Sequence, residues 1–348
     1  MNPLHFAVVV GIKSYPGISD LQSALGDAEA FCQWLQTDGG VPPENIKLIH
    51  VDQKFDDPIA AKPSRDDINT ALKQVNASVE AKIKDAPLDW EKTRLYFYVS
   101  GHGIAPTAGE TALLLANASE GNWGENIACR SYLERYVDCQ YFKEVLVFSD
   151  CCRNRLAADL GIPPFGRKIT RGRVEKFLGY ATLLGDAAYE PTEGADPNQA
   201  RSFFTQALLE GLNGAATDRQ TGEINTATLA AYMHRRVVDM TSDKRYHQIP
   251  EFPTDPGRPI ILRPATAPIL APPQHTITIV FPADFSGTAD LFYSIDRPLG
   301  SWKAADGNWV VKLQDGLYEV RPAGENDGSR FQSNGLFKIN GGDCYVQL

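Results

Sequence analysis

The sequence predicts an α/β fold with a mainly parallel open sheet flanked by helices, followed by a small all-β sandwich. Apolar runs alternate with amphipathic helical segments through roughly the first 265 residues, a pattern typical of right-handed crossovers in a parallel sheet. Prolines then cluster within 263–275 and prevent regular structure. Short strand-like runs follow at turn-like spacing. We therefore expect one domain over 1–262, a stiff linker over 263–275 and a small β-sandwich domain over 276–348.

Five apolar runs are the candidate strands of the parallel sheet. Two of them, 94–101 and 144–150, are continuously apolar, which is expected of parallel strands that helices cover on both faces. A regular alternation of these runs with helices also makes a single large core plausible for a chain of 348 residues. The runs lie at 5–12, 45–52, 94–101, 144–150 and 176–187.

Helical segments separate and follow these strands. One helix is expected to begin near Asp27, because the apolar residues after it recur at helical spacing. A second helix is expected after Ser64, which is a favourable N-cap residue and is followed by two aspartates in the first turn. Two later helices are predicted within 202–214 and 225–240.

Composition excludes several functional classes. The formal net charge of −9 argues against a nucleic-acid-binding surface. The apolar run near the N-terminus is too short for a signal peptide or a membrane span, so we expect a cytoplasmic protein without a membrane partner. The cysteines form neither a disulfide-dense framework nor a zinc-site pattern, so we expect reduced thiols and no metal. They are Cys32, Cys129, Cys139, Cys151, Cys152 and Cys344.

Two of the predicted strands end in residues that can do chemistry. His102 follows one strand within Ser-Gly-His-Gly, and Cys151 and Cys152 follow another within Asp-Cys-Cys-Arg. Ligand sites gather beyond the carboxyl ends of parallel strands, so an imidazole and a thiol there can reach one substrate. The imidazole activates the thiol by taking its proton. Because Gly103 has no side chain, its backbone N–H can face inward and donate to the oxyanion.

These motifs resemble the catalytic segments of the caspase and metacaspase superfamily of cysteine peptidases. His102 precedes Cys152 by 50 residues, a separation that belongs to the family and is therefore part of the resemblance. The likeness spans about 1–262 and implies the caspase-like version of the α/β fold. The appended β module is similar to those of prokaryotic members. The resemblance implies a cysteine endopeptidase whose substrates are proteins or peptides.

The resemblance also implies individual roles. The family motifs align on the second cysteine, so Cys152 is the expected nucleophile, with His102 as its partner and the N–H groups of Gly103 and Cys152 as oxyanion donors. Asp150 and Asp27 match the metacaspase aspartates that line the specificity pocket. Two such carboxylates favour Arg or Lys before the cut bond. The alternative for Asp27 is that it only caps a helix.

Arg153 matches the caspase motif rather than the metacaspase motif, and Asn154 stands where the family usually has glycine or serine. These departures bear on substrate fit rather than on the dyad.

The tract after the nucleophile is rich in basic residues. In this superfamily the corresponding stretch is where the precursor is cut into two subunits. A site that prefers basic residues beside such a tract predicts self-cleavage within 167–173; the alternative is a solvated basic loop. The candidate positions are Arg167, Lys168, Arg171 and Arg173.

Other functions remain as alternatives. Metacaspases often need calcium, but the acidic residues clustered here lack EF-hand order, so we expect no cofactor and keep calcium as the alternative. The β domain has no catalytic constellation and is a candidate site for a partner protein. Two functions compete with the peptidase. One is a catalytically inactive caspase-like scaffold that binds a partner through the β domain, and the other is a thiol redox centre at the paired cysteines. The acidic residues are Asp56, Asp57, Asp66 and Asp67.

Overall fold

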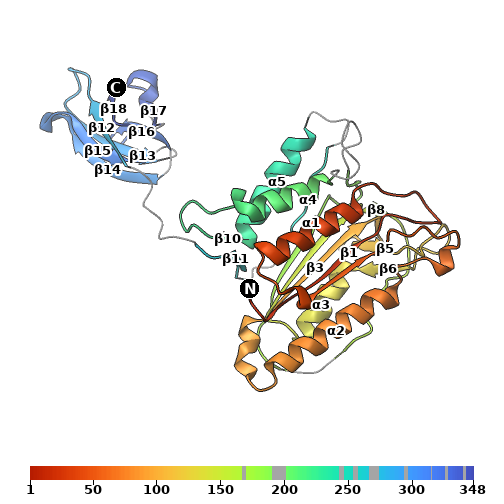
Figure 1. Cartoon of the computed structure of the whole chain (residues 1–348). Helices are drawn as coiled ribbons and strands as arrows, with labels where there is room; N and C mark the ends of the chain where they lie inside the picture. Colours follow the sequence, from red (N-terminus) through yellow and green to blue (C-terminus); the bar gives the residue numbers. More distant parts are fainter. Residues whose placement is uncertain are drawn as a thin grey trace. The chain divides into compact units, whose positions relative to one another are not determined.

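In the computed structural model, a parallel sheet lies at the centre of the first of two units, Met1–Thr266 and Ala267–Leu348 (Figure 1). Its strand order is β2-β1-β3-β7-β9, and every pairing is parallel. The strands are β1 (His5–Gly11), β2 (Ile46–His50), β3 (Arg94–Gly101), β7 (Glu144–Cys151) and β9 (Glu175–Tyr180). The structure describes residues 1–166, 170–189, 201–242, 247–253, 258–265, 274–293, 297–314, 316–325, 328–339 and 342–348.

Helices cover both faces of this sheet, which confirms the predicted α/β class (Figure 1). One face packs against α1 (Ala24–Thr37), α4 (Phe203–Glu210) and α5 (Thr226–Thr241). The other packs against α2 (Arg65–Ile83) and α3 (Cys129–Cys139).

The strands are continuously apolar because successive side chains enter opposite cores. In β1, Phe6 and Val8 belong to the core beneath α2 and α3, whereas Ala7 and Val9 belong to the core beneath α1 and α4. All four are fully buried. The sheet therefore has no solvent-facing side, and the edge that remains available for a ligand is the carboxyl end of its strands.

Local sequence explains how α1 and α2 begin and pack. A Cβ at Gly11 would lie 2.6 Å from the carbonyl oxygen of Ala24, so only glycine lets α1 approach β1 this closely. At the start of α2, the Ser64 N–H donates to the Asp67 carboxylate over 2.7 Å, which completes the predicted N-terminal cap.

The structure differs from the sequence prediction at the fifth strand, which ends at Tyr180 rather than 187. Tyr180 itself exchanges two backbone hydrogen bonds with Glu251, and the last backbone hydrogen bond to β7 runs from the Ala181 N–H to the Ser149 carbonyl. The chain then turns at Gly185, whose φ of 97° is in the left-handed region. This early end places segment 183–189 beside the end of β7.

Several small elements were not predicted. Helix α3 was missed, as was a second sheet in the order β6-β5-β4-β8. Strands of two or three residues leave too little pattern to be recognised. These strands are β4 (Gly103–Ala105), β5 (Ala112–Leu114), β6 (Asn126–Ala128) and β8 (Asn154–Arg155); a further pair joins β10 (Ile224–Asn225) to β11 (Ile261–Arg263). The short helical turns are η1 (Pro43–Asn45), η2 (Pro58–Ala60), η3 (Pro87–Lys92) and η4 (Gly211–Ala215).

The second unit contains two small, largely antiparallel sheets in the orders β15-β12-β18 and β14-β13-β16-β17. Side chains from both sheets, including Ile279 and Leu291, share one core. Most of the predicted linker, 266–273, lies outside the described residues. The elements are β12 (His275–Val280), β13 (Thr288–Tyr293), β14 (Arg297–Lys303), η5 (Ala304–Asp306), β15 (Trp309–Leu313), β16 (Gly316–Pro322), η6 (Gln332–Gly335), β17 (Leu336–Ile339) and β18 (Cys344–Gln347).

A search of the helices within the described ranges finds none that combines the length and apolarity needed to cross a bilayer.

The packing of α1 on the sheet supplies the first testable prediction. Phe31 is fully buried and stacks on Tyr98 at a centroid distance of 4.7 Å, with Trp34 and Phe148 also in ring contact. We expect Phe31→Ala to lower the free energy of unfolding of the first unit by about 3–5 kcal/mol, because it leaves a cavity in this aromatic cluster. Urea unfolding followed by far-UV circular dichroism measures this change. Leu88→Ala, at a side chain 87% exposed, is the matched control; equal midpoints for both variants would contradict the packing argument.

Candidate active site

His102 lies directly after β3 and is fixed from two sides. Its backbone N–H donates to the Tyr15 hydroxyl over 3.0 Å, and its backbone carbonyl accepts from the Leu114 N–H over 2.8 Å. The ring nitrogen Nε2 lies 2.7 Å from the carbonyl oxygen of Ser19. Because a carbonyl only accepts, Nε2 carries the proton and Nδ1 is the nitrogen able to take one.

Tyr15 and Ser19 are functional neighbours that sequence reasoning missed. The Tyr15 ring packs against the imidazole at a centroid distance of 4.8 Å, and its hydroxyl also donates to the Leu114 carbonyl. Burial raises the pKa of Tyr15 well above its usual value, so the phenol stays neutral and can donate and accept at once. The Ser19 carbonyl leaves no trace in the sequence, because every residue has one.

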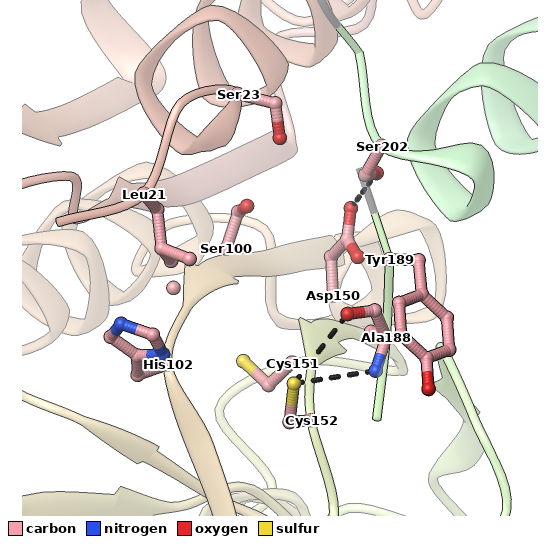
Figure 2. Close-up of a pocket in the computed structure, with 11 residues that line it drawn as sticks. Leu21, Ser23, Ser100, His102, Asp150, Cys151, Cys152, Ala188, Tyr189 and Ser202 are labelled. Atoms are coloured by element: carbon pink, nitrogen blue, oxygen red, sulfur yellow. Dashed lines mark hydrogen bonds between the residues drawn. The ribbon is translucent and has the colours of Figure 1, made fainter. Parts of the chain in front are cut away.

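The two adjacent cysteines occupy different environments. Cys151 is the last residue of β7 and is buried in the core beneath α2 and α3, where burial raises the pKa of its thiol well above the usual value. Cys152 follows it and is half-buried in a hollow beyond the strand ends. The Ala188 N–H donates to the Cys152 Sγ over 3.3 Å (Figure 2). The Cys152 thiol in turn donates to the Ala188 carbonyl over 3.6 Å, so the backbone of Ala188 positions the sulfur through two hydrogen bonds.

Strand pairing brings His102 and Cys152 together. In the parallel register of β3 and β7, Ser100 lies opposite Asp150 and Gly101 opposite Cys151, so His102 and Cys152 are the next residues on neighbouring strands. Neighbouring strands lie about 5 Å apart. His102 and Cys152 line the same hollow (Figure 2).

Gly103 is a position of close approach. A Cβ there would lie 2.5 Å from both the Cys151 Cβ and the Cys152 carbonyl oxygen, and 3.3 Å from the Cys152 nitrogen. The backbone of Cys152 therefore leaves no room for a side chain at Gly103. A side chain at this position would push the histidine and cysteine segments apart.

Asp27 and Asp150 lie together behind the dyad. Asp150 accepts from the hydroxyls of Ser202 and Thr205, the latter over 2.7 Å, and the Tyr98 hydroxyl lies 3.4 Å away (Figure 2). Asp27 accepts from the Ser202 N–H over 3.1 Å. Burial and the neighbouring Asp150 carboxylate raise the pKa of Asp27 well above its usual value. Asp27 also hydrogen-bonds to the side chain of Ser23, the N-cap residue of α1, so it contacts the start of its own helix as well as Ser202.

The hollow beside Asp150 is small. It holds about 30 Å³, which is room for a single water molecule, and Ala188, Tyr189 and Ser202 line it together with Asp150. Ser202 thus occupies the place that a cationic substrate group would need. From the sequence, Ser202 was expected only at the start of a helix. Serine is common at helix N-caps, so the sequence does not reveal that its hydroxyl also contacts the Asp150 carboxylate.

Arg153 points away from the reacting groups. It is 1% exposed, pairs with Glu251, donates to the Thr182 carbonyl over 3.1 Å and stacks on the Tyr180 ring at 4.2 Å. Its backbone N–H also donates to Asp186. The arginine therefore anchors the segment after Cys152 to the turn that carries Ala188, and its side chain is not available to a substrate.

The described part of the basic tract is held by ion pairs. Arg171 makes a bidentate pair with Glu80 over 2.7 and 2.9 Å, and its N–H donates to Gln140. Arg173 is exposed, and its carbonyl accepts from Lys143 over 2.8 Å. Arg167 and Lys168 lie outside the described residues.

The clustered aspartates serve as caps. Asp67 closes the first turn of α2, and Asp57 accepts from the Ile59 N–H over 2.9 Å. Within the described ranges, no three His, Cys, Asp or Glu side chains gather as metal ligands would. None of the six cysteines, all of which lie in described segments, forms a disulfide.

The sequence and the structure were compared with known proteins. A family model for the caspase domain matches residues 4–258. Among solved structures, caspase-1 from Spodoptera frugiperda is 15% identical with a TM-score of 0.47, covering 76% of this chain and 92% of its own. A structure described as pro-sf-caspase-1 is 16% identical with a TM-score of 0.41, covering 75% and 90%. No curated protein matches the sequence. Because the family model matches most of the chain, the protein belongs to the caspase-domain family and has the fold of its cysteine peptidases.

Proposed function

We propose that this protein is a cysteine endopeptidase that cuts protein substrates after Arg or Lys. One observation carries the proposal: His102 and Cys152 line a common hollow with Asp150, which is buried beside Asp27. A thiol beside an imidazole is a nucleophile with its base, and a buried carboxylate pair next to it is a receptor for a cation.

The proposed chemistry needs no cofactor. Nδ1 of His102 takes the thiol proton of Cys152, and the sulfur forms a bond to the substrate carbonyl carbon. The negative oxygen accepts from the N–H groups of Gly103 and Cys152. The C–N bond then breaks, and the departing amine takes the proton from the imidazolium. Water attacks the remaining thioester, gives a proton to His102 and releases the acid, and the thiol regains that proton.

The carboxylate pair supports selection of a basic residue. Two buried carboxylates repel each other, so without a substrate one of them keeps a proton and both depend on hydroxyl and amide donors. A guanidinium or ammonium supplies both the positive charge and several donors. For a substrate cation to enter, Ser202 must give up its contact with Asp150, because the present cavity is too small for a side chain.

The nucleophile assignment is tested by paired cysteine variants. We expect Cys152→Ala to reduce kcat/KM for fluorogenic peptides ending in Arg by about 10⁴-fold or more, because the attacking sulfur is lost. Cys151→Ala removes a buried thiol and is expected to keep kcat/KM within about tenfold. Labelling with an arginine-derived electrophile gives a second readout, with adduct formation on wild type and none on Cys152→Ala. Labelling that survives in Cys152→Ala and disappears in Cys151→Ala would reverse the assignment. No labelling and no cleavage would favour the idle scaffold.

The carboxylate pair predicts a pH dependence specific to basic substrates. The raised pKa of Asp27 means that lowering the pH through it neutralises the receptor and weakens attraction for a cation. We expect the ratio of kcat/KM for an Arg peptide to that for its neutral citrulline analogue to rise with pH. Titration of the dyad cancels in this ratio. Asp27→Asn should lower the ratio and flatten its pH profile; an unchanged profile, or preferential cleavage after Asp, would reject the pocket.

Self-cleavage in the basic tract follows from the same specificity. The exposure of Arg173 supports a cut there, whereas the ion pair of Arg171 with Glu80 must open first. Arg167 and Lys168 are the other proposed positions. We expect intact mass spectrometry to detect two fragments with wild type and a full-length chain with Cys152→Ala. The fragment masses identify the bond, and full-length chains in both samples would reject self-cleavage.

A further inference from the structure

A second hollow adjoins His102 and Cys152. It has a volume of about 330 Å³ and shares only His102 and Cys152 with the hollow that contains Asp150. Its walls are mainly apolar and come from Ile18, Ile104, Leu114, Trp123 and Leu156. The two hollows therefore meet at His102 and Cys152 and differ in character: the Asp150 carboxylate lines one, and aliphatic and aromatic side chains line the other.

Hydrogen bonds of the small sheet hold the walls of this second hollow in place. Ile104 pairs with Asn154 between β4 and β8, and the Leu156 N–H donates to the Ala105 carbonyl. The Trp123 carbonyl accepts from the Asn126 side chain over 2.8 Å. Three segments thus form the walls. One is the turn at Trp123, which a hydrogen bond to Asn126 holds in place; the others are β4, which follows His102, and the chain at β8, which follows Cys152.

We infer that this hollow binds the side chain of the residue that follows the cut bond, and that the residue is aromatic or branched aliphatic. The inference rests on the proposed function and extends it to the leaving side of the substrate. In an extended peptide, successive side chains point to opposite sides. A chain whose carbonyl carbon lies at Cys152 and whose basic side chain enters the carboxylate pocket therefore presents its next side chain toward the second hollow.

Size and charge favour an apolar occupant over a small or basic one. The volume accommodates a Phe or Leu side chain. A Gly at the same substrate position would leave the apolar lining of the hollow exposed to water. Arg155 is the one charged lining residue besides His102 among the described residues of this hollow, and it repels Lys or Arg. The expected substrate sequence is thus a basic residue followed by an apolar one.

Internally quenched peptides that differ only in the residue after Arg test this inference. We expect kcat/KM for Arg-Phe and Arg-Leu to exceed that for Arg-Gly by about tenfold, and Arg-Lys to be the poorest of the four. Leu156→Ala and Trp123→Ala should each reduce the Phe-to-Gly ratio, because each removes part of the apolar wall. Leu88→Ala, at an exposed leucine remote from the hollow in sequence, should leave the ratio unchanged.

The ratio is measured on one preparation, so a fraction of unfolded enzyme affects both substrates equally and cancels. A Phe-to-Gly ratio near one in wild type, with normal cleavage after Arg, would overturn the inference and leave the proposed function standing. A high ratio that neither variant reduces would also overturn it, because the selectivity would then arise elsewhere. Failure to cut any peptide after Arg or Lys would overturn both.

Discussion

The parallel register between β3 and β7 is the constraint on which the site depends. Gly101 beside Cys151 makes His102 and Cys152 equivalent residues at the exits of two neighbouring strands. A slip of one residue would send every side chain of one strand to the opposite face, so the burial of both faces fixes the register strongly. The close contact of Gly103 with the backbone of Cys152 then holds the two exits together after the strands have ended. The core therefore determines the geometry of the reacting groups, although none of them belongs to the core.

The carboxylate pocket stores an electrostatic cost that a substrate can relieve. Two buried carboxyls are unfavourable neighbours, and the structure offsets this with a proton on the pair and with donors from Ser202, Thr205 and Tyr98. These donors are neutral, so they satisfy the oxygens without cancelling the charge. Under the proposed function a substrate cation would do both. Ser202 contacts Asp150 in this structure, so the proposal couples entry of a cation to release of Ser202 and lowers the expected substrate affinity by the free energy of opening.

Much of the fold could be predicted because its signals are long and local. Continuous apolar runs of six to eight residues identified the sheet, and Ser64 identified the start of α2. Strands of two or three residues and α3 were missed, because their pattern is too short or too polar. At the site, side-chain motifs pointed to His102 and Cys152, whereas the Ser19 carbonyl and the Ser202 hydroxyl act through tertiary contacts with segments distant in sequence. Backbone acceptors and hydroxyl donors occur throughout a chain, so only the folded geometry distinguishes these two.

The four residues from Asp150 to Arg153 show how alternation along a strand serves several purposes within one short segment. Asp150 contacts Ser202 in the small hollow, Cys151 enters the opposite core, Cys152 lines the hollow, and the buried Arg153 pairs with the partly exposed Glu251. The arginine is buried with its charge balanced and its plane stacked on Tyr180, so it links the strand exit to the turn that carries Ala188. Because Ala188 donates to the Cys152 sulfur, the position of the nucleophile depends on that buried ion pair as well as on the sheet. The sulfur of Cys152 is thus positioned both by the exit of β7 and by the backbone of Ala188, which lies in the turn that Arg153 anchors.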